Sequence, residues 1–195
     1  MLHLPLAALE AGLSEIRRSP TDEGRVVLIV RRPALDEREV LTEAELDPST
    51  GLVGDTWPVR PSIRTPDRSP HPGMQLNIMN ARVAALVAGW PAPSVVDRRA
   101  QAGDQFYLDL DLSEANLPPG SRLQLGSAII EVTEVPHLGC AKFSARFGPD
   151  AIRFVNSAAG RELRLRGLNA RVVAAGTVRT GDAVSKSEVS AQRNP

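Results

Sequence analysis

The segment Arg122–Phe147, RLQLGSAIIEVTEVPHLGCAKFSARF, contains a predicted hairpin, a cysteine and a predicted helix in that order. Its apolar residues alternate on both sides of Gly126-Ser127, which predicts a β-hairpin of residues 122–125 and 128–135. Cys140 follows this hairpin. A helix is expected over 141–147, so the cysteine lies where a strand gives way to a helix.

The same reading gives a mainly β (α+β) class for the rest of the chain. Strands are expected at 25–32, 74–78, 106–110, 168–175 and 182–184, and helices at 6–16, 80–88 and 149–156. Residues 36–47 suit either a short helix or an irregular turn that runs into a strand. Residues 51–73, with five prolines, are expected to form a long irregular loop that is either functional or mobile. One domain over 1–186 and a flexible tail over 187–195 complete the prediction.

Composition excludes several function classes. Lys+Arg and Asp+Glu both number 23, which argues against binding to nucleic acid or to a membrane surface through bulk charge. Only two of the basic residues are lysines, and this arginine excess has two explanations, anion binding or a genomic base bias. The chain has no apolar run long enough to span a membrane and no secretory signal, so a cytoplasmic location is expected.

Cys140 is the one cysteine of the chain, so an internal disulfide and a multi-cysteine metal site are both impossible. A helix start, His137 and Lys142 would all favour its reactive thiolate. Alternatively it is a small buried hydrophobic residue, as most lone cysteines are. His137 and Cys140 together are too few ligands for an ordinary zinc site.

Other polar residues remain ambiguous on sequence alone. Asp55 follows Gly54 in a segment that suits an Asp-containing turn, and Asp104 follows Gly103 in a similar setting. Lys142 could form a Schiff base with pyridoxal phosphate, but no phosphate-binding motif supports that cofactor. The late cluster of Arg146, Arg166 and their neighbours is either a solvated helix face or an anion-binding rim near Cys140.

The order of the motifs resembles the MOSC domain, the C-terminal domain of molybdenum cofactor sulfurase and its stand-alone bacterial relatives. The resemblance covers residues 19–186. It is carried by GLVGD (51–55), GDQF (103–106), LPPGSRLQLG (117–126), EVT (131–133), Cys140, RGLNARV (166–172) and GTVRTGD (176–182). The departures are HLG before Cys140, where the family commonly has Arg-x-Pro, GDQ at 103–105 for Gly-Glu-Asn, and GDTW at 54–57 for Gly-Asp-Arg-His. His71 is the candidate replacement for that last histidine.

The resemblance implies a β-barrel with peripheral helices and a molybdenum–pterin cofactor, with Cys140 as the metal ligand and Asp104 as a proton donor whose pKa burial raises. Residues expected to bind the cofactor are Asp55, His71, His137, Lys142, Arg146, Arg166 and Asn169.

Three functions follow from the resemblance: a reductase of N-hydroxylated or related N–O compounds, a sulfur or cofactor carrier that uses a Cys140 persulfide, and a non-catalytic interaction domain. Expected partners are a small-molecule substrate and an electron-donor or sulfur-donor protein.

Overall fold

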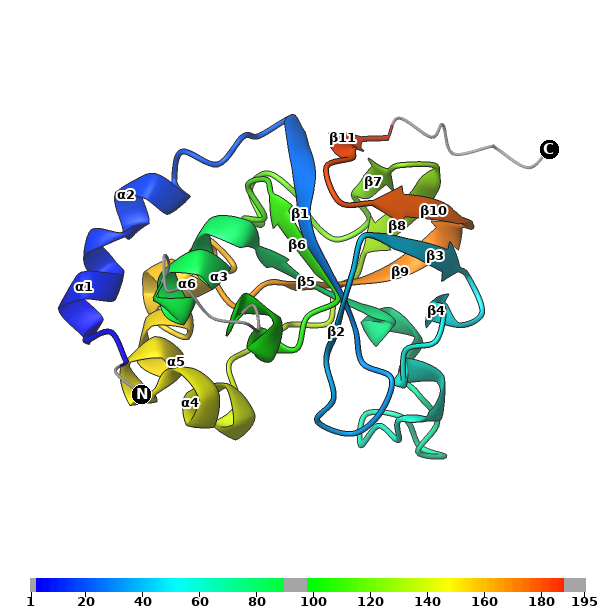
Figure 1. Cartoon of the computed structure of the whole chain (residues 1–195), viewed down its shortest axis with the longest axis horizontal. Coiled ribbons are helices and arrows are strands. Elements are labelled where there is room, and N and C mark those ends of the chain that lie inside the picture. The colour runs from blue at the N-terminus through cyan, green and yellow to red at the C-terminus, as the bar shows by residue number, and fades with distance from the viewer. Residues whose placement is uncertain (1–2, 90–97, 188–195) are drawn as a thin grey trace.

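Seven strands close into a barrel within residues 3–89 and 98–187, the part of the chain that the computed structural model describes (Figure 1). In order around the barrel they are β1 (Glu23–Arg31), β11 (Ala183–Lys186), β7 (Arg122–Leu125), β8 (Ala128–Val132), β9 (Leu168–Ala174), β5 (Leu76–Asn80) and β6 (Phe106–Asp109). The barrel closes because β1 pairs with β11 along one edge and with β6 along the other. Neighbouring strands are antiparallel except β5 and β6, which are parallel.

Four short strands lie outside or beside this closed set. β2 (Glu39–Leu41) pairs with the end of β1 and extends the sheet. A separate three-stranded sheet has the order β10 (Gly176–Arg179), β3 (Glu43–Asp47) and β4 (Gly51–Leu52). The long proline-rich loop leaves from β4 and returns at β5.

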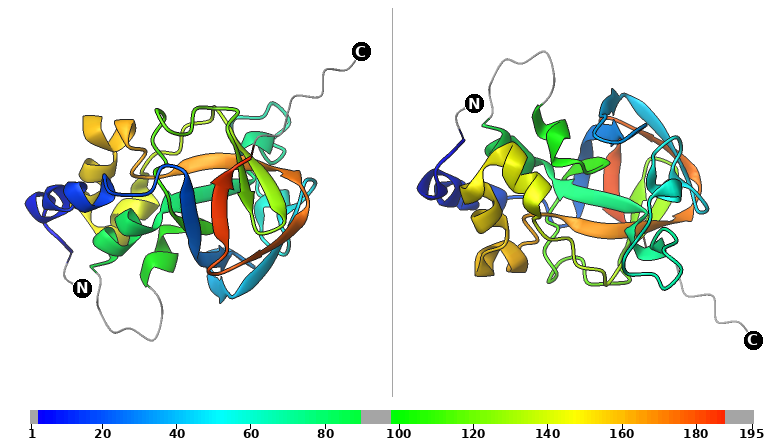
Figure 2. Two further views of the ribbon diagram at one scale, coloured as in Figure 1. Left: turned by 90° about the horizontal axis from the view of Figure 1, so that it is seen from above. Right: turned by 90° about the horizontal axis from the view of Figure 1, so that it is seen from below.

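The helices gather on one side of the barrel (Figure 2). They are α1 (Leu6–Ala11), α2 (Leu13–Ile16), α3 (Ala81–Ala88), α4 (Ala141–Phe147), α5 (Pro149–Val155) and α6 (Ala158–Glu162), with short 3-10 turns at Trp57–Val59, Pro72–Met74 and Arg98–Ala102. One apolar cluster fills the barrel and a second lies between barrel and helices. Within the described residues, no helix has the length and apolar character needed to cross a membrane.

The β-rich barrel with peripheral helices confirms the predicted fold class, and most element positions agree with the sequence reading. The alternative of a helix within 36–47 is wrong, because this segment forms β2 and β3. The single helix expected over 6–16 is divided at Gly12. Sequence reading missed α6, β10 and β4, and β4 takes the first two residues of the loop expected over 51–73 because they pair with β3. Except for Ser187, the expected tail at 187–195 lies outside the described residues.

Asn80 anchors the junction between β5 and α3 in the way its sequence position predicts. Its side-chain oxygen accepts hydrogen bonds from the backbone N–H groups of Arg82 and Val83, and Gly89 ends the helix in the left-handed conformation. Its amide nitrogen also donates to the Ser19 hydroxyl and to the Leu110 carbonyl, each at 2.8 Å. The side chain therefore caps a helix and joins two further segments in the interior.

We predict that Asn80→Ala is more destabilising than Ser157→Ala, which removes the matching cap of α6. Both changes remove a helix cap, which costs about 1 kcal/mol. Only Asn80→Ala also leaves two buried acceptors without their donor, at about 1–3 kcal/mol more. Urea unfolding followed by circular dichroism measures both losses, and equal losses would contradict this assignment.

Candidate functional site

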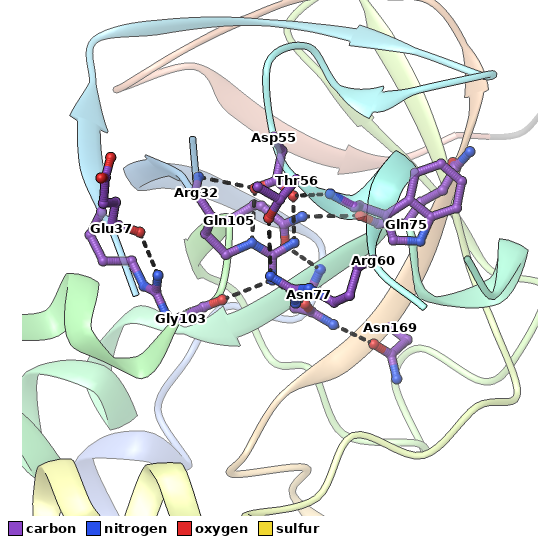
Figure 3. Close-up of polar contacts among 12 residues, drawn as sticks. Arg32, Glu37, Asp55, Thr56, Arg60, Gln75, Asn77, Gly103, Gln105 and Asn169 are labelled. Atoms are coloured by element: carbon purple, nitrogen blue, oxygen red, sulfur yellow. Dashed lines mark hydrogen bonds and ion pairs between the residues drawn. The ribbon is translucent and has the colours of Figure 1, made fainter. Parts of the chain in front are cut away.

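A buried ion pair joins the end of β1 to the start of the proline-rich loop (Figure 3). Arg32 directs Nε and Nη2 to the two carboxylate oxygens of Asp55, each at 2.8 Å, and the two side chains are 3% and 0% exposed. The Asp55 carboxylate also accepts from the backbone N–H of Trp57 at 2.9 Å, which is the Asp-containing turn considered from sequence. Asp55 is thus both a turn residue and the counter-ion of Arg32.

Amide side chains continue this polar network across neighbouring strands. The Nη1 of Arg32 donates to Asn77 Oδ1 at 2.8 Å and to the Gly103 carbonyl at 3.1 Å. Asn77 in turn donates to the fully buried Asn169 at 2.6 Å. Gln105 accepts from the backbone N–H of Asn77 at 2.8 Å. One connected network therefore links β1, β5, β9 and the segment before β6.

Two further guanidinium groups meet over Gly103. Its backbone has φ +86°, and a Cβ built there would lie 3.1 Å from Arg38 Nη2 and 3.4 Å from Arg146 Nη1. Glycine is required at this position because a side chain would be strained and would crowd both cations. Partial burial, followed by the charges of Arg146 and Arg32, lowers the pKa of Arg38.

Of the three arginines Arg32, Arg38 and Arg146, Arg38 is the one without a carboxylate partner among the described residues. Arg32 pairs with Asp55, and Arg146 pairs with Asp36 at 3.1 Å. Arg38 makes no ion pair with any described carboxylate, and its buried Nε has no hydrogen-bond partner in that part of the chain. The region around Gly103 is therefore suited to an anionic group.

Asp104, the next residue, is completely buried and held by Arg166. Arg166 Nη1 lies 2.9 and 2.7 Å from the two carboxylate oxygens, and its Nη2 donates to the Ala102 carbonyl at 3.1 Å. Burial raises the pKa of Asp104, as expected from its sequence, while Arg166 opposes this shift. The carboxyl group has no surface of its own for a substrate to contact.

His137 is a partly exposed polar residue beside the buried Asp104. Its Nδ1 lies 3.5 Å from Asp104 Oδ1, and its side chain is 13% exposed. Burial, and then the charges of Arg166 and Arg32, hold the pKa of His137 well below its ordinary value. The imidazole is therefore neutral at physiological pH. A neutral ring is sufficient beside Asp104, because Arg166 already provides the counter-charge of that carboxylate.

Cys140 occupies the N-cap position of α4 and is exposed. The loop before it is fixed by Asn156, whose side chain accepts from the Gly139 N–H at 2.9 Å and donates to the Gly139 carbonyl at 3.2 Å. Arg146 lies further along the same helix. α4 therefore carries the thiol at its start and one of the cations over Gly103 near its end.

The structure brings some of the predicted site residues together and leaves others apart. Asp104, His137 and Arg166 form one cluster. Asn169 instead belongs to the network of Arg32, because it accepts a hydrogen bond from Asn77 at 2.6 Å, and it also donates to the Val135 carbonyl at 3.0 Å. Lys142 is exposed and lies 3.6 Å from Asp36.

His71 lies in the proline-rich loop, where it lines a cavity with Trp57 and Asn77. It is therefore close to the Asp55 turn, as the sequence interpretation supposed.

Four network residues were not singled out from sequence: Arg32, Arg38, Asn77 and Gln105. The available signal was the density of arginines immediately after β1, in the segment Arg31–Arg38.

The donor set fits a metal that arrives with its own ligands rather than a metal held by protein alone. In the described ranges, no group of three or more His, Cys, Asp or Glu side chains could hold a metal ion. An exposed thiol is a soft ligand that suits molybdenum when other ligands come from a dithiolene. The unpartnered Arg38 Nε and the glycine cradle at 103 suit an attached phosphate.

Comparison with known proteins gives an independent view of the chain. A family model described as "MOSC domain" matches residues 81–185. YuaD from Bacillus subtilis has a similar structure, with a TM-score of 0.60 and 18% identity, over 83% of this chain and 94% of that one. YiiM from Geobacillus stearothermophilus has a TM-score of 0.57 and 14% identity, over 85% and 75%.

YiiM from Escherichia coli has a TM-score of 0.52 and 18% identity, over 84% of this chain and 69% of that one. No curated protein sequence matches the chain.

We predict that Asp104→Asn destabilises the protein by about 3–5 kcal/mol, because the buried Arg166 loses its counter-ion. Glu43→Gln is the matched control. Glu43 pairs with Arg179 on the surface, where the two side chains are 50% and 62% exposed, so its loss should cost less than about 1 kcal/mol. Urea denaturation at neutral pH measures both, and a loss for Asp104→Asn no larger than that of the control would refute the role of this pair.

Proposed function

Because the chain belongs to the MOSC domain family, a family associated with the molybdenum cofactor, we propose that it binds a molybdenum–pterin cofactor through Cys140 and reduces N-hydroxylated or related N–O compounds. The observation that carries the proposal is the arrangement of α4. The exposed Cys140 begins this helix, and Arg146 of the same helix meets Arg38 over Gly103. A metal ligand and an anion-binding pair therefore lie on adjoining elements.

The chain's own residues have separate tasks in this proposal. The sulfur of Cys140 is the metal ligand, and it is accessible because this residue is exposed at the N-cap position of α4. Arg38 and Arg146 hold the phosphate, with Gly103 providing room for its approach. When bound, the cofactor supplies two-electron redox chemistry at its metal.

Proton delivery involves Asp104 and His137 rather than Asp104 alone. Reduction of an N–O bond takes two electrons and two protons and releases water, so a proton source is needed. Asp104 has no exposed surface, and Nδ1 of the partly exposed His137 lies 3.5 Å from its Oδ1. Asp104 is the counter-ion of Arg166 in the resting protein, and it serves as the buried acid after a proton has reached it from solvent through His137.

The decisive measurement is the molybdenum and pterin content of protein made in cells that produce the cofactor. We expect wild type to carry both, Cys140→Ala to lose most of the metal, and Ser144→Ala on the same helix to keep it. Arg38→Gln should lower the pterin content while leaving the thiol intact. Near-zero molybdenum in wild type and Cys140→Ala alike would overturn cofactor binding.

The activity itself is tested by reduction of an N-hydroxylated amidine with chemically reduced methyl viologen. Turnover by wild type and none by Cys140→Ala is the expected result. Cofactor-loaded protein without turnover on N–O compounds would leave binding in place and refute the reductase.

The exposure of Cys140 favours a second function, the transfer of sulfur. An accessible thiolate can attack the outer sulfur of a low-molecular-weight persulfide. It accepts that sulfur as a Cys140 persulfide and releases the donor as a thiol. Mass spectrometry of the intact protein would then show one added sulfur atom, removed by dithiothreitol. Cys140→Ser should remain unchanged, and an unmodified wild-type protein would rule out this carrier role.

A further inference from the structure

The proline-rich loop between β4 and β5 lines an open cavity of about 240 Å³, and none of the residues given a task in the proposed function belongs to its lining. Trp57, Ile63 and Met74 form its apolar surface, and Arg60, Arg64 and His71 contribute its polar groups. Asn77, which also bonds Arg32, lies at the boundary between this cavity and the buried network. Figure 3 shows Arg60 beside Arg32 and Asn77 at this boundary.

The charge of the cavity is one-sided. Two guanidinium groups line it, and no carboxylate does so among residues 3–89 and 98–187. The Arg60 side chain donates a hydrogen bond to a neutral acceptor, the Thr56 hydroxyl, at 3.2 Å. Partial desolvation and the nearby charge of Arg32 lower the pKa of Arg60. An anion would relieve the mutual repulsion of these cations.

The apolar wall is held in a fixed orientation. The indole Nε1 of Trp57 donates to the His71 carbonyl at 3.3 Å, and the Trp57 backbone is bound by Asp55. Ile63, which lines the same cavity, is 86% exposed. A fixed indole beside a methionine and an exposed isoleucine offers a surface against which a flat ring can stack.

His71 adds a donor to this surface. Its Nδ1 accepts a hydrogen bond from the Gly73 N–H at 3.1 Å, which places the ring proton of the neutral imidazole on Nε2. The polar groups of the cavity wall are thus predominantly hydrogen-bond donors, namely two guanidinium groups and one imidazole N–H. This set recognises acceptor oxygens, as in a phosphate or a carboxylate.

We propose that this cavity binds a flat ring that carries an anionic group, either a phosphate or a carboxylate. The ring packs against Trp57 and Met74, and the anion is bound by Arg60 and Arg64. The site lies in a different part of the chain from Cys140 and is tested in protein that lacks any cofactor. A negative result here would therefore leave the proposed function standing.

The test compares AMP, which has both a ring and a phosphate, with adenosine and with inorganic phosphate. Trp90→Phe leaves Trp57 as the one tryptophan, so its fluorescence reports on the cavity. We expect AMP to change this fluorescence in a saturable way. Adenosine lacks the phosphate and inorganic phosphate lacks the ring, so each should bind at least about tenfold more weakly than AMP. Equal affinity for AMP and adenosine, or no saturable change with AMP, would overturn the proposal.

Variants made in the same Trp90→Phe background assign the anion to its residues. Arg60→Gln and Arg64→Gln should each weaken AMP binding by about tenfold, since a charge-assisted hydrogen bond is lost. Arg68→Gln is the matched control, because Arg68 belongs to the same loop but does not line the cavity. A loss with Arg68→Gln as large as with Arg60→Gln would show a diffuse charge effect and overturn the site.

One further comparison identifies the source of the ring and anion. Protein loaded with the molybdenum–pterin cofactor is titrated with AMP alongside cofactor-free protein. Binding by both forms shows that the cavity takes a separate ligand, such as a substrate. Binding by the cofactor-free form alone would show that the cavity belongs to the site of the cofactor itself, and this result would overturn the proposal of a separate ligand.

Discussion

The buried ion pair of Arg32 and Asp55 is the interaction that positions the polar end of the barrel. A desolvated pair is stable only when its remaining donors and acceptors are also satisfied. Arg32 meets this condition by bonding Asn77 on β5 and the Gly103 carbonyl before β6, while the Asp55 carboxylate binds the Trp57 N–H. One guanidinium group therefore fixes four chain segments that are far apart in sequence.

This constraint also explains why the other arginines remain available. Asp55 is committed to Arg32, and Asp104 is committed to Arg166. Arg38 on one side of Arg32 and Arg60 on the other have no such partner among the described carboxylates, and burial and neighbouring positive charge lower the pKa of each. The same end of the molecule thus has a compensated interior and an uncompensated rim, which is the electrostatic condition for anion binding.

Short sequence patterns predicted the elements whose structure depends on residues close together in the chain. Alternation identified the hairpin before Cys140, and Asn80 and Gly89 marked the two ends of α3. Closure of the barrel depends on the pairing of β1 with β11, and the chain separates these strands by more than 150 residues, so no local pattern contains it. The site follows the same division. Cys140 and Asp104 could be proposed from motif order, whereas the role of Arg38 required knowing that β1 ends beside Gly103.

The loop before Cys140 shows how a departure from the family pattern is accommodated. A proline commonly precedes the family's cysteine and stiffens the backbone there. Gly139 has no such restriction, but Asn156 bonds both its N–H and its carbonyl. Proline lacks that N–H, so it could not form the first of these bonds. Contact also favours glycine, because a Cβ at 139 would lie 3.0 Å from Val155 and 3.1 Å from Ile152. The side chain of Asn156, the C-cap residue of α5, therefore holds the backbone immediately before Cys140, where a proline would restrict it from within the loop.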